Sequence, residues 1–185
     1  MSITLPTQGA YTRTAVGLHW LIAGLIGVAL VMGWIMTDLG VTPLKLKMYN
    51  WHKWVGITVL ALAVLRVLWR LTHRPPDLLP MPAWQRLAAH GLHLGLYGLM
   101  LALPLSGWVY SNATGFPIVY LRLLPLPNLV AKNKALAGTW HEVHETLGGL
   151  LVAALVLHAL AALKHHFIDR DDTLRRMLRR VPAGH

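Results

Sequence analysis

The sequence predicts an all-α protein, a four-helix bundle that spans a membrane, and three observations predict it. Of the 185 residues, 55% are hydrophobic and only 13% are charged, whereas soluble domains are about one-quarter charged. Four apolar runs, at 14–37, 50–71, 87–110 and 143–165, are long enough to cross hydrocarbon as helices. No run alternates polar and apolar residues as a membrane strand does. Four spans with their connections fill 1–185 as a single domain.

The four runs differ in what interrupts them. The first carries no formal charge, and we expect it to be retained rather than removed as a signal peptide. The uncharged part of the second lies between Lys53 and Arg66, so this helix spans only if Lys53, Arg66 and Arg70 extend their charges to the interfaces. The third contains Pro104, which we expect to mark a kink, and the fourth carries Glu145 near its start. Tryptophans near the ends fit an aromatic belt.

The connection at 111–140 is long and partly apolar, and we expect it to lie in the outer interface and cap the bundle. The basic residues set the orientation, because cytoplasmic loops carry an excess of Lys and Arg. With the N-terminus inside, eleven basic residues face inward: Arg13, Arg66, Arg70, Arg74, Arg86, Lys164, Arg170, Arg175, Arg176, Arg179 and Arg180. Six face outward: Lys45, Lys47, Lys53, Arg122, Lys132 and Lys134. We therefore expect a multi-pass protein of the bacterial inner membrane with both termini in the cytoplasm, and the basic tail as an anchor on anionic lipid.

Composition also excludes several functions. The chain has no cysteine, so disulfides, thiolate catalysis, Cys-bound iron–sulfur clusters and covalently attached haem are excluded. The formal net charge of +10 could indicate nucleic-acid binding. The basic residues flank the spans rather than form one face, so we expect no nucleic-acid partner.

A histidine within an apolar run is costly and points to function, and four of them, His19, His52, His144 and His158, lie at matching depths. His144 and His158 are 14 residues apart in the fourth run. Fourteen residues are close to four helical turns, so both rings project from one face, separated by roughly 21 Å at about 1.5 Å per residue. The alternating direction of the spans puts His19 at the depth of His158, and His52 at the depth of His144.

Each pair comes from two helices of a bundle, which is where cofactor sites are built. Two imidazoles on opposite faces of an iron porphyrin form a six-coordinate b-type haem, held without covalent bonds. The sequence thus predicts two haems, an inner one on His19 and His158 and an outer one on His52 and His144. With both axial positions filled, such an iron exchanges electrons and binds no oxygen. Zinc is a poor alternative because structural zinc needs four clustered ligands. Any one of these histidines alone could instead be structural or relay protons.

Other polar residues near the inner end have several possible roles. His90 and His93, one turn apart, could replace His19 as a ligand, or bind a haem propionate or a quinone. His165, Arg66 and Arg70 are further candidates for propionate or quinone binding, which needs an apolar slot with a few polar groups.

The sequence resembles the bacterial cytochrome b561 family, compact di-haem membrane proteins of four helices. The resemblance covers nearly the whole chain, and the segments that carry it are Gly17-Leu18-His19-Trp20, Trp51-His52-Lys53-Trp54-Val55-Gly56, Leu65 to Arg70, His90 to Pro104, His144-Glu145-Thr146-Leu147, His158, His165-His166-Phe167 and Asp172-Thr173-Leu174. By this resemblance, His19, His52, His144 and His158 match the axial ligands. A second His-Glu pair, His141-Glu142, precedes the motif at His144, which is a departure; the 14-residue spacing favours His144 as the ligand.

The resemblance also implies a function. The family is similar to the cytochrome b subunits of hydrogenases and formate dehydrogenases, and members of this size include superoxide oxidases, which pass electrons from superoxide to ubiquinone. A basic outer face would steer an anion such as superoxide, and the candidates are Lys45, Lys47, Lys53, Arg122, Lys132 and Lys134, although ordinary loop solvation explains them as well. We expect a superoxide:ubiquinone oxidoreductase. The alternative is a non-catalytic electron-transfer subunit that links a partner dehydrogenase to the quinone pool, and a structural membrane protein without cofactor comes third.

Overall fold

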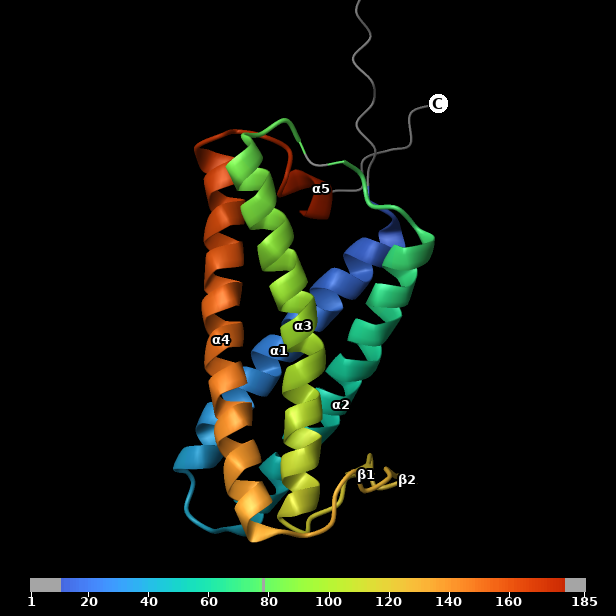
Figure 1. The fold of residues 1–185 in the computed structure, drawn as a ribbon, viewed down its shortest axis with the longest axis vertical. Coiled ribbons are helices and arrows are strands. Elements are labelled where there is room, and N and C mark those ends of the chain that lie inside the picture. The colour runs from blue at the N-terminus through green and yellow to red at the C-terminus, as the bar shows by residue number, and fades with distance from the viewer. Residues whose placement is uncertain (1–10, 78, 179–185) are drawn as a thin grey trace, which may run out of the picture.

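A computed structural model describes residues 11–77 and 79–178 as a bundle of four long helices (Figure 1). They are α1 (Arg13–Asp38), α2 (Pro43–Thr72), α3 (Ala83–Ala113) and α4 (Lys134–Phe167). All four are long and apolar enough to cross a membrane, so the predicted all-α transmembrane bundle is confirmed. Below, the end holding the start of α1 is called the inner end, and the opposite end the outer end.

The helices begin earlier and end later than the apolar runs, and side-chain caps fix the starts of α1, α2 and α4. Thr12 caps α1 by accepting a hydrogen bond from the backbone of Ala15, and Asn133 caps α4 in the same way through Leu136. The α3–α4 connection is therefore 114–133, shorter than the expected 111–140. The polar first turns of α4 carry no apolar signal, although they are helical. Pro104 lies inside α3, which continues through it.

The α3–α4 connection contains a small hairpin that the sequence did not indicate. Strands β1 (Val119–Tyr120) and β2 (Leu124–Pro125) pair antiparallel, and their turn places Leu121 and Arg122 at positive φ. The hairpin lies beside the outer part of α2 (Figure 1). The indole of Trp54 donates to the carbonyl of Val119 (2.8 Å), and the hydroxyls of Thr58 and Tyr120 are 2.9 Å apart. These bonds fix the connection against the outer end of the bundle.

One small core layer sits at mid-height and joins all four helices. It contains Ile22 and Ile26 of α1, Val59 of α2, Leu96 of α3 and Leu151 of α4. Leu151 lies midway between His144 and His158 in the sequence, so this layer separates the two ends of the bundle. Many other large apolar side chains face outward, as expected where the solvent is lipid.

The segment after α4 folds back onto the inner end. It includes the short helix α5 (Arg175–Leu178), and the indole of Trp20 donates to the carbonyl of Met177 (2.7 Å). Arg179 and Arg180 of the expected anchoring tail lie outside the described residues.

Candidate functional site

The outer end brings together the two histidines that the sequence paired by depth. The rings of His52 on α2 and His144 on α4 have centroids 6.2 Å apart and planes at 81°. A metal bound about 2 Å from a nitrogen of each ring, with ring bonds of about 1.3–1.4 Å, puts the ring centres about 6 Å apart. The separation of His52 and His144 therefore fits two imidazoles on opposite sides of one metal.

His144 is oriented by α3. Its Nδ1 lies 3.1 Å from the carbonyl oxygen of Leu103 and 2.9 Å from the hydroxyl oxygen of Ser106. Because the Ser106 hydroxyl donates to the same carbonyl (2.7 Å), both neighbours of Nδ1 act as acceptors. Nδ1 must therefore carry the proton, and Nε2 keeps its lone pair free. This is the arrangement that orients metal-binding histidines in general.

A glycine makes room for the His144 ring. A Cβ added at Gly107 would lie 2.9 Å from Cε1 of His144 and 3.1 Å from its Nδ1, which is closer than van der Waals contact allows. The His52 ring faces Gly33 of α1 at an ordinary 3.6 Å from the corresponding Cβ position. Within 11–77 and 79–178, Nδ1 of His52 is the one buried side-chain nitrogen or oxygen without a well-formed hydrogen bond, and the backbone of Ala29 on α1 lies close enough to offer the His52 ring a weak one.

A cavity of about 490 Å³ lies against these two rings. This volume falls in the range of about 300–1,000 Å³ for small-molecule and cofactor sites. Its wall is mostly apolar and comes from all four helices and the α3–α4 connection, with a polar rim of Tyr49, Asn50, Lys53, Tyr110 and Ser111. The outer end thus offers two suitably spaced imidazoles and a cavity that a porphyrin could occupy.

The inner end gathers three histidines from three helices. The His19 and His158 rings have centroids 6.2 Å apart with planes at 68°, and His93 of α3 lies 5.4 Å from His158 at 69°. The His19–His158 separation repeats that of the outer pair and fits one metal between the rings. The His93–His158 separation is shorter than this geometry requires. The geometry therefore favours His19 over His93 as the partner of His158, and leaves His93 beside the pair.

The other inner residues fall into two groups. Arg66 lies close enough to His19, His93 and His158 to act on each electrostatically, and Arg70 reaches only His93 among them. By contrast, His90 is exposed, and its Nδ1 donates to the carbonyl of Arg86 at 2.8 Å.

His165 lies one heptad beyond His158, where its Nδ1 is 2.7 Å from Asp171 and 3.1 Å from Asp169. Lys164 pairs with Asp169, and the Thr173 backbone donates to Asp171. Burial by itself raises the pKa of Asp171, but the hydrogen bonds from Thr173 and His165 outweigh burial and hold it below its usual value. These bonds fasten the segment after α4.

The six outer basic residues are not equivalent. Only Lys53 among them lines the outer cavity, and its Nζ donates to the carbonyl of Phe116 at 3.4 Å. Lys45 instead donates to the carbonyl of Thr37 in α1 (3.4 Å) and to that of Leu39, which follows the helix (2.6 Å). Arg122 occupies the hairpin turn, and the stem of Lys132 packs near Gly115. The sequence did not indicate Ser106 and Gly107, because a serine and a glycine beside a proline carry no signal that they face a histidine of another helix.

Comparison with known proteins gives the family. The model of the prokaryotic cytochrome b561 family matches residues 10–180. The chain belongs to this family. Among its relatives is cytochrome b561 homolog 2 of Escherichia coli (strain K12), 37% identical over 93% of each chain. A probable superoxide oxidase of Yersinia pestis is 31% identical, with 91% of this chain and 95% of that one covered. Cytochrome b562 of Cereibacter sphaeroides is 30% identical, with 93% and 97% covered.

Membership gives the coarse properties of this cytochrome. It is an electron-transfer protein of a bacterial inner membrane and binds b-type haem. The resemblance noted in the sequence is thereby confirmed.

Proposed function

We propose that this cytochrome binds two b-type haems and transfers electrons from superoxide at the outer end to ubiquinone at the inner end. The observation that carries the proposal is the pair of equal histidine separations, 6.2 Å at each end of the bundle. In net terms, two superoxide anions give two dioxygen molecules and two electrons, and these with two protons convert one ubiquinone to ubiquinol.

The proposed ligand sets use residues of three helices. His52 and His144 would hold the outer haem, and His19 and His158 would hold the inner one. The Nδ1 bonds of His144 to Leu103 and Ser106 fix its ring and leave Nε2 as the atom that would bind the iron. When bound, haem b supplies a one-electron carrier at each end. On α4, the histidines that would hold them, His144 and His158, are separated by a rise of about 21 Å at about 1.5 Å per residue.

The remaining polar residues have supporting roles in this proposal. Lys53 on the cavity rim, with Lys45 and Lys47 nearby in the sequence, raises the local concentration of a small anion at the outer site. At the inner end, Arg66 and His93 face the histidine pair and are suited to bind a haem propionate or a quinone carbonyl. The relation to a probable superoxide oxidase supports superoxide as the donor. The excess of basic residues at the inner end supports cytoplasmic termini.

The test uses the purified holoprotein alone. Superoxide should reduce the haems at a rate that falls as salt rises, because exposed charges are screened over about 10 Å at 0.1 M ionic strength. Lys53→Glu should slow this reduction much more than reduction by a neutral donor. Arg86→Glu, the same charge change at an exposed inner position, is the matched control and should leave both rates unchanged.

Two results would count against the proposal. If superoxide reduces the haems no faster than a neutral donor does, superoxide is not the substrate. If the haems pass electrons to ubiquinone only after a dehydrogenase is added, the protein is an electron-transfer subunit of a larger complex.

A further inference from the structure

Three arginines gather at the inner end of α2. Arg66 and Arg70 are one turn apart on the helix, and Arg74 follows two residues after its last residue, Thr72. Within 11–77 and 79–178, none of the ion pairs involves any of the three. Three positive charges close together without a carboxylate repel one another, and an anion placed among them would relieve that repulsion.

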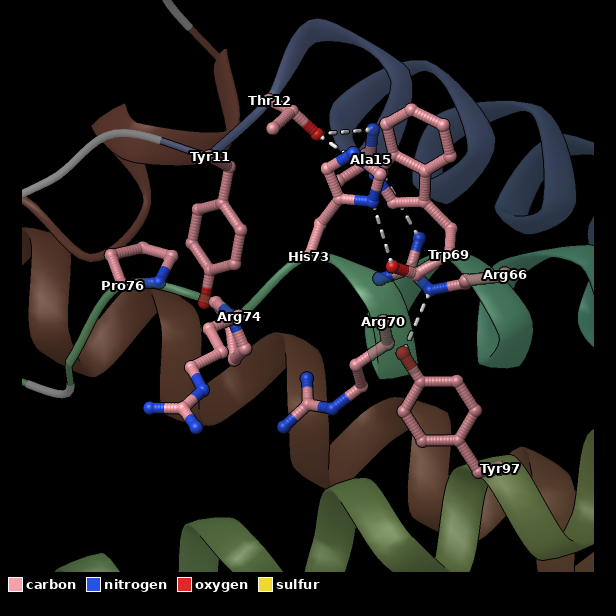
Figure 2. A pocket seen from close by; sticks show the side chains of 11 residues that line it. Tyr11, Thr12, Ala15, Arg66, Trp69, Arg70, His73, Arg74, Pro76 and Tyr97 are labelled. Carbon is pink, nitrogen blue, oxygen red and sulfur yellow. Dashed lines mark hydrogen bonds between the residues drawn. The ribbon is translucent and has the colours of Figure 1, made fainter.

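These arginines line a small pocket between the start of α1, the end of α2 and Tyr97 of α3 (Figure 2). Arg66 is held in place, because Nε donates to the Tyr97 hydroxyl (3.1 Å) and Nη1 to the carbonyl of Ala15 (3.3 Å). Arg70 lies over the Tyr97 ring, 5.8 Å from its centroid. In Figure 2 the guanidinium groups of Arg70 and Arg74 point away from α1 and carry none of the bonds that hold Arg66.

The opposite wall of the pocket is also fixed. The rings of Trp69 and His73 stack with centroids 3.8 Å apart and planes at 4°, and the Trp69 indole donates to the Thr12 hydroxyl (3.0 Å). The pocket therefore has a preformed shape and does not depend on mobile lysines.

Size and position narrow the choice of ligand. The pocket has a volume of about 50 Å³, enough for a group the size of a few waters and far below the range of about 300–1,000 Å³ for whole cofactors. A phosphate group meets this limit, and arginine binds phosphate oxygens in bidentate fashion. Arg70 and Arg74 are exposed at the end of a membrane helix, beside the last residue of α2, which is the level of lipid headgroups.

We propose that this basic pocket binds the phosphate of an anionic phospholipid through Arg70 and Arg74. Arg66 does not bind the phosphate in this proposal, because it is already held by Tyr97 and Ala15 beside the inner histidines. Basic pockets between helices at the inner side of a membrane are suited to such headgroups. A free phosphate has the same chemistry, and a haem propionate is a second anion that could reach Arg70. Lipid binding at this pocket does not depend on which electron donor or acceptor the protein uses, so its test is independent of the test of the proposed function.

The experiment compares four full-length holoproteins: wild type, Arg70→Gln, Arg74→Gln and Arg86→Gln. The last removes the same charge at the same end, at a residue that does not line the pocket. Phosphatidylglycerol bound to each protein is counted by native mass spectrometry. Thermal unfolding is measured in symmetric bilayers of phosphatidylcholine, with and without phosphatidylglycerol, so that the membrane orientation does not matter. Haem per chain reports whether each variant is folded.

The proposal expects wild type to retain phosphatidylglycerol and to gain thermal stability from it. Arg70→Gln and Arg74→Gln should each weaken retention about fivefold, the usual effect of one basic residue near an anionic surface. Arg86→Gln should retain the lipid as wild type does. Equal loss in all three variants, or no loss in any, would overturn the proposal. If Arg70→Gln loses haem but retains the lipid, Arg70 binds a haem propionate, which contradicts the proposal. If equimolar inorganic phosphate displaces the lipid, the ligand is free phosphate, which also contradicts the proposal.

Discussion

Replacing Gly107 by alanine should weaken haem binding at the outer site without unfolding the bundle. The new Cβ would lie 2.9 Å from Cε1 of His144, whereas carbon atoms prefer separations of about 3.5–4.0 Å. The ring must therefore move by at least roughly 0.6 Å. Because Leu103 and Ser106 lie on the same helix as Gly107, moving the ring away from α3 stretches both of its Nδ1 hydrogen bonds.

The size of the effect follows from these two bonds. Each is worth about 0.5–1.5 kcal/mol in net terms, so losing both costs about 1–3 kcal/mol. That corresponds to about 5- to 150-fold weaker binding at the outer site, which brackets the roughly 10- to 100-fold found when the partner of a metal-binding histidine is removed. Alanine also favours the helix over glycine by about 0.5–1 kcal/mol, which offsets part of this cost, so the bundle should remain folded.

Gly98→Ala is the matched control, because it lies on the same helix and an added Cβ there meets nothing within 4 Å. The assay measures haem per chain from the visible spectrum, and the rate of haem loss to a scavenger protein. Gly107→Ala should lose haem from one site much faster than Gly98→Ala. If the two variants retain haem equally, His144 is not held as the structure indicates, and this reasoning is refuted.

Three further predictions concern single contacts. Ser106→Ala leaves the Leu103 carbonyl to hold His144, so haem retention should fall only a few-fold, about 1 kcal/mol. Asp171 has a lowered pKa in the folded protein, so its stabilisation is present above its usual pKa of about 4 and is lost as pH falls through the lowered value. Protection of 169–178 against hydrogen exchange, corrected for the intrinsic effect of pH on exchange, should therefore fall at acid pH in the wild type, and at neutral pH should be lower in Asp171→Asn than in the wild type. The chain has no native cysteine, so Lys132→Cys should react with an impermeant thiol reagent only from the periplasm, and Arg86→Cys only from the cytoplasm; the reverse pattern would invert the orientation.

The sequence predicted what depends on helical periodicity. A spacing of 14 residues puts His144 and His158 on one face of any straight helix, and the alternating direction of the spans gives His52 and His19 the matching depths. The structure has both pairs at 6.2 Å. The depths of the four histidines can therefore be predicted without knowing how each helix is rotated about its axis, provided that the histidines face the inside of the bundle.

What the sequence did not predict depends on side-chain packing between helices. The contact of Gly107 with His144 arises only when α3 and α4 are placed side by side. The hairpin at 119–125 is stabilised by bonds to α2, such as that of Trp54 to Val119, and its turn residues Leu121 and Arg122 are not typical of positive φ. The apolar runs do not show where the helices end, because polar turns extend the helices beyond the runs, as at the start of α4.

The most direct test of the account is the number of haems per chain in the purified protein and in four single variants. The account predicts two b-type haems in the intact protein. His52→Ala and His144→Ala should each lose the same haem, and His19→Ala and His158→Ala should each lose the other, as judged by the spectrum of the haem that remains. One haem per intact chain, or an inner haem that survives His19→Ala but is lost in His93→Ala, would contradict the proposed pairing.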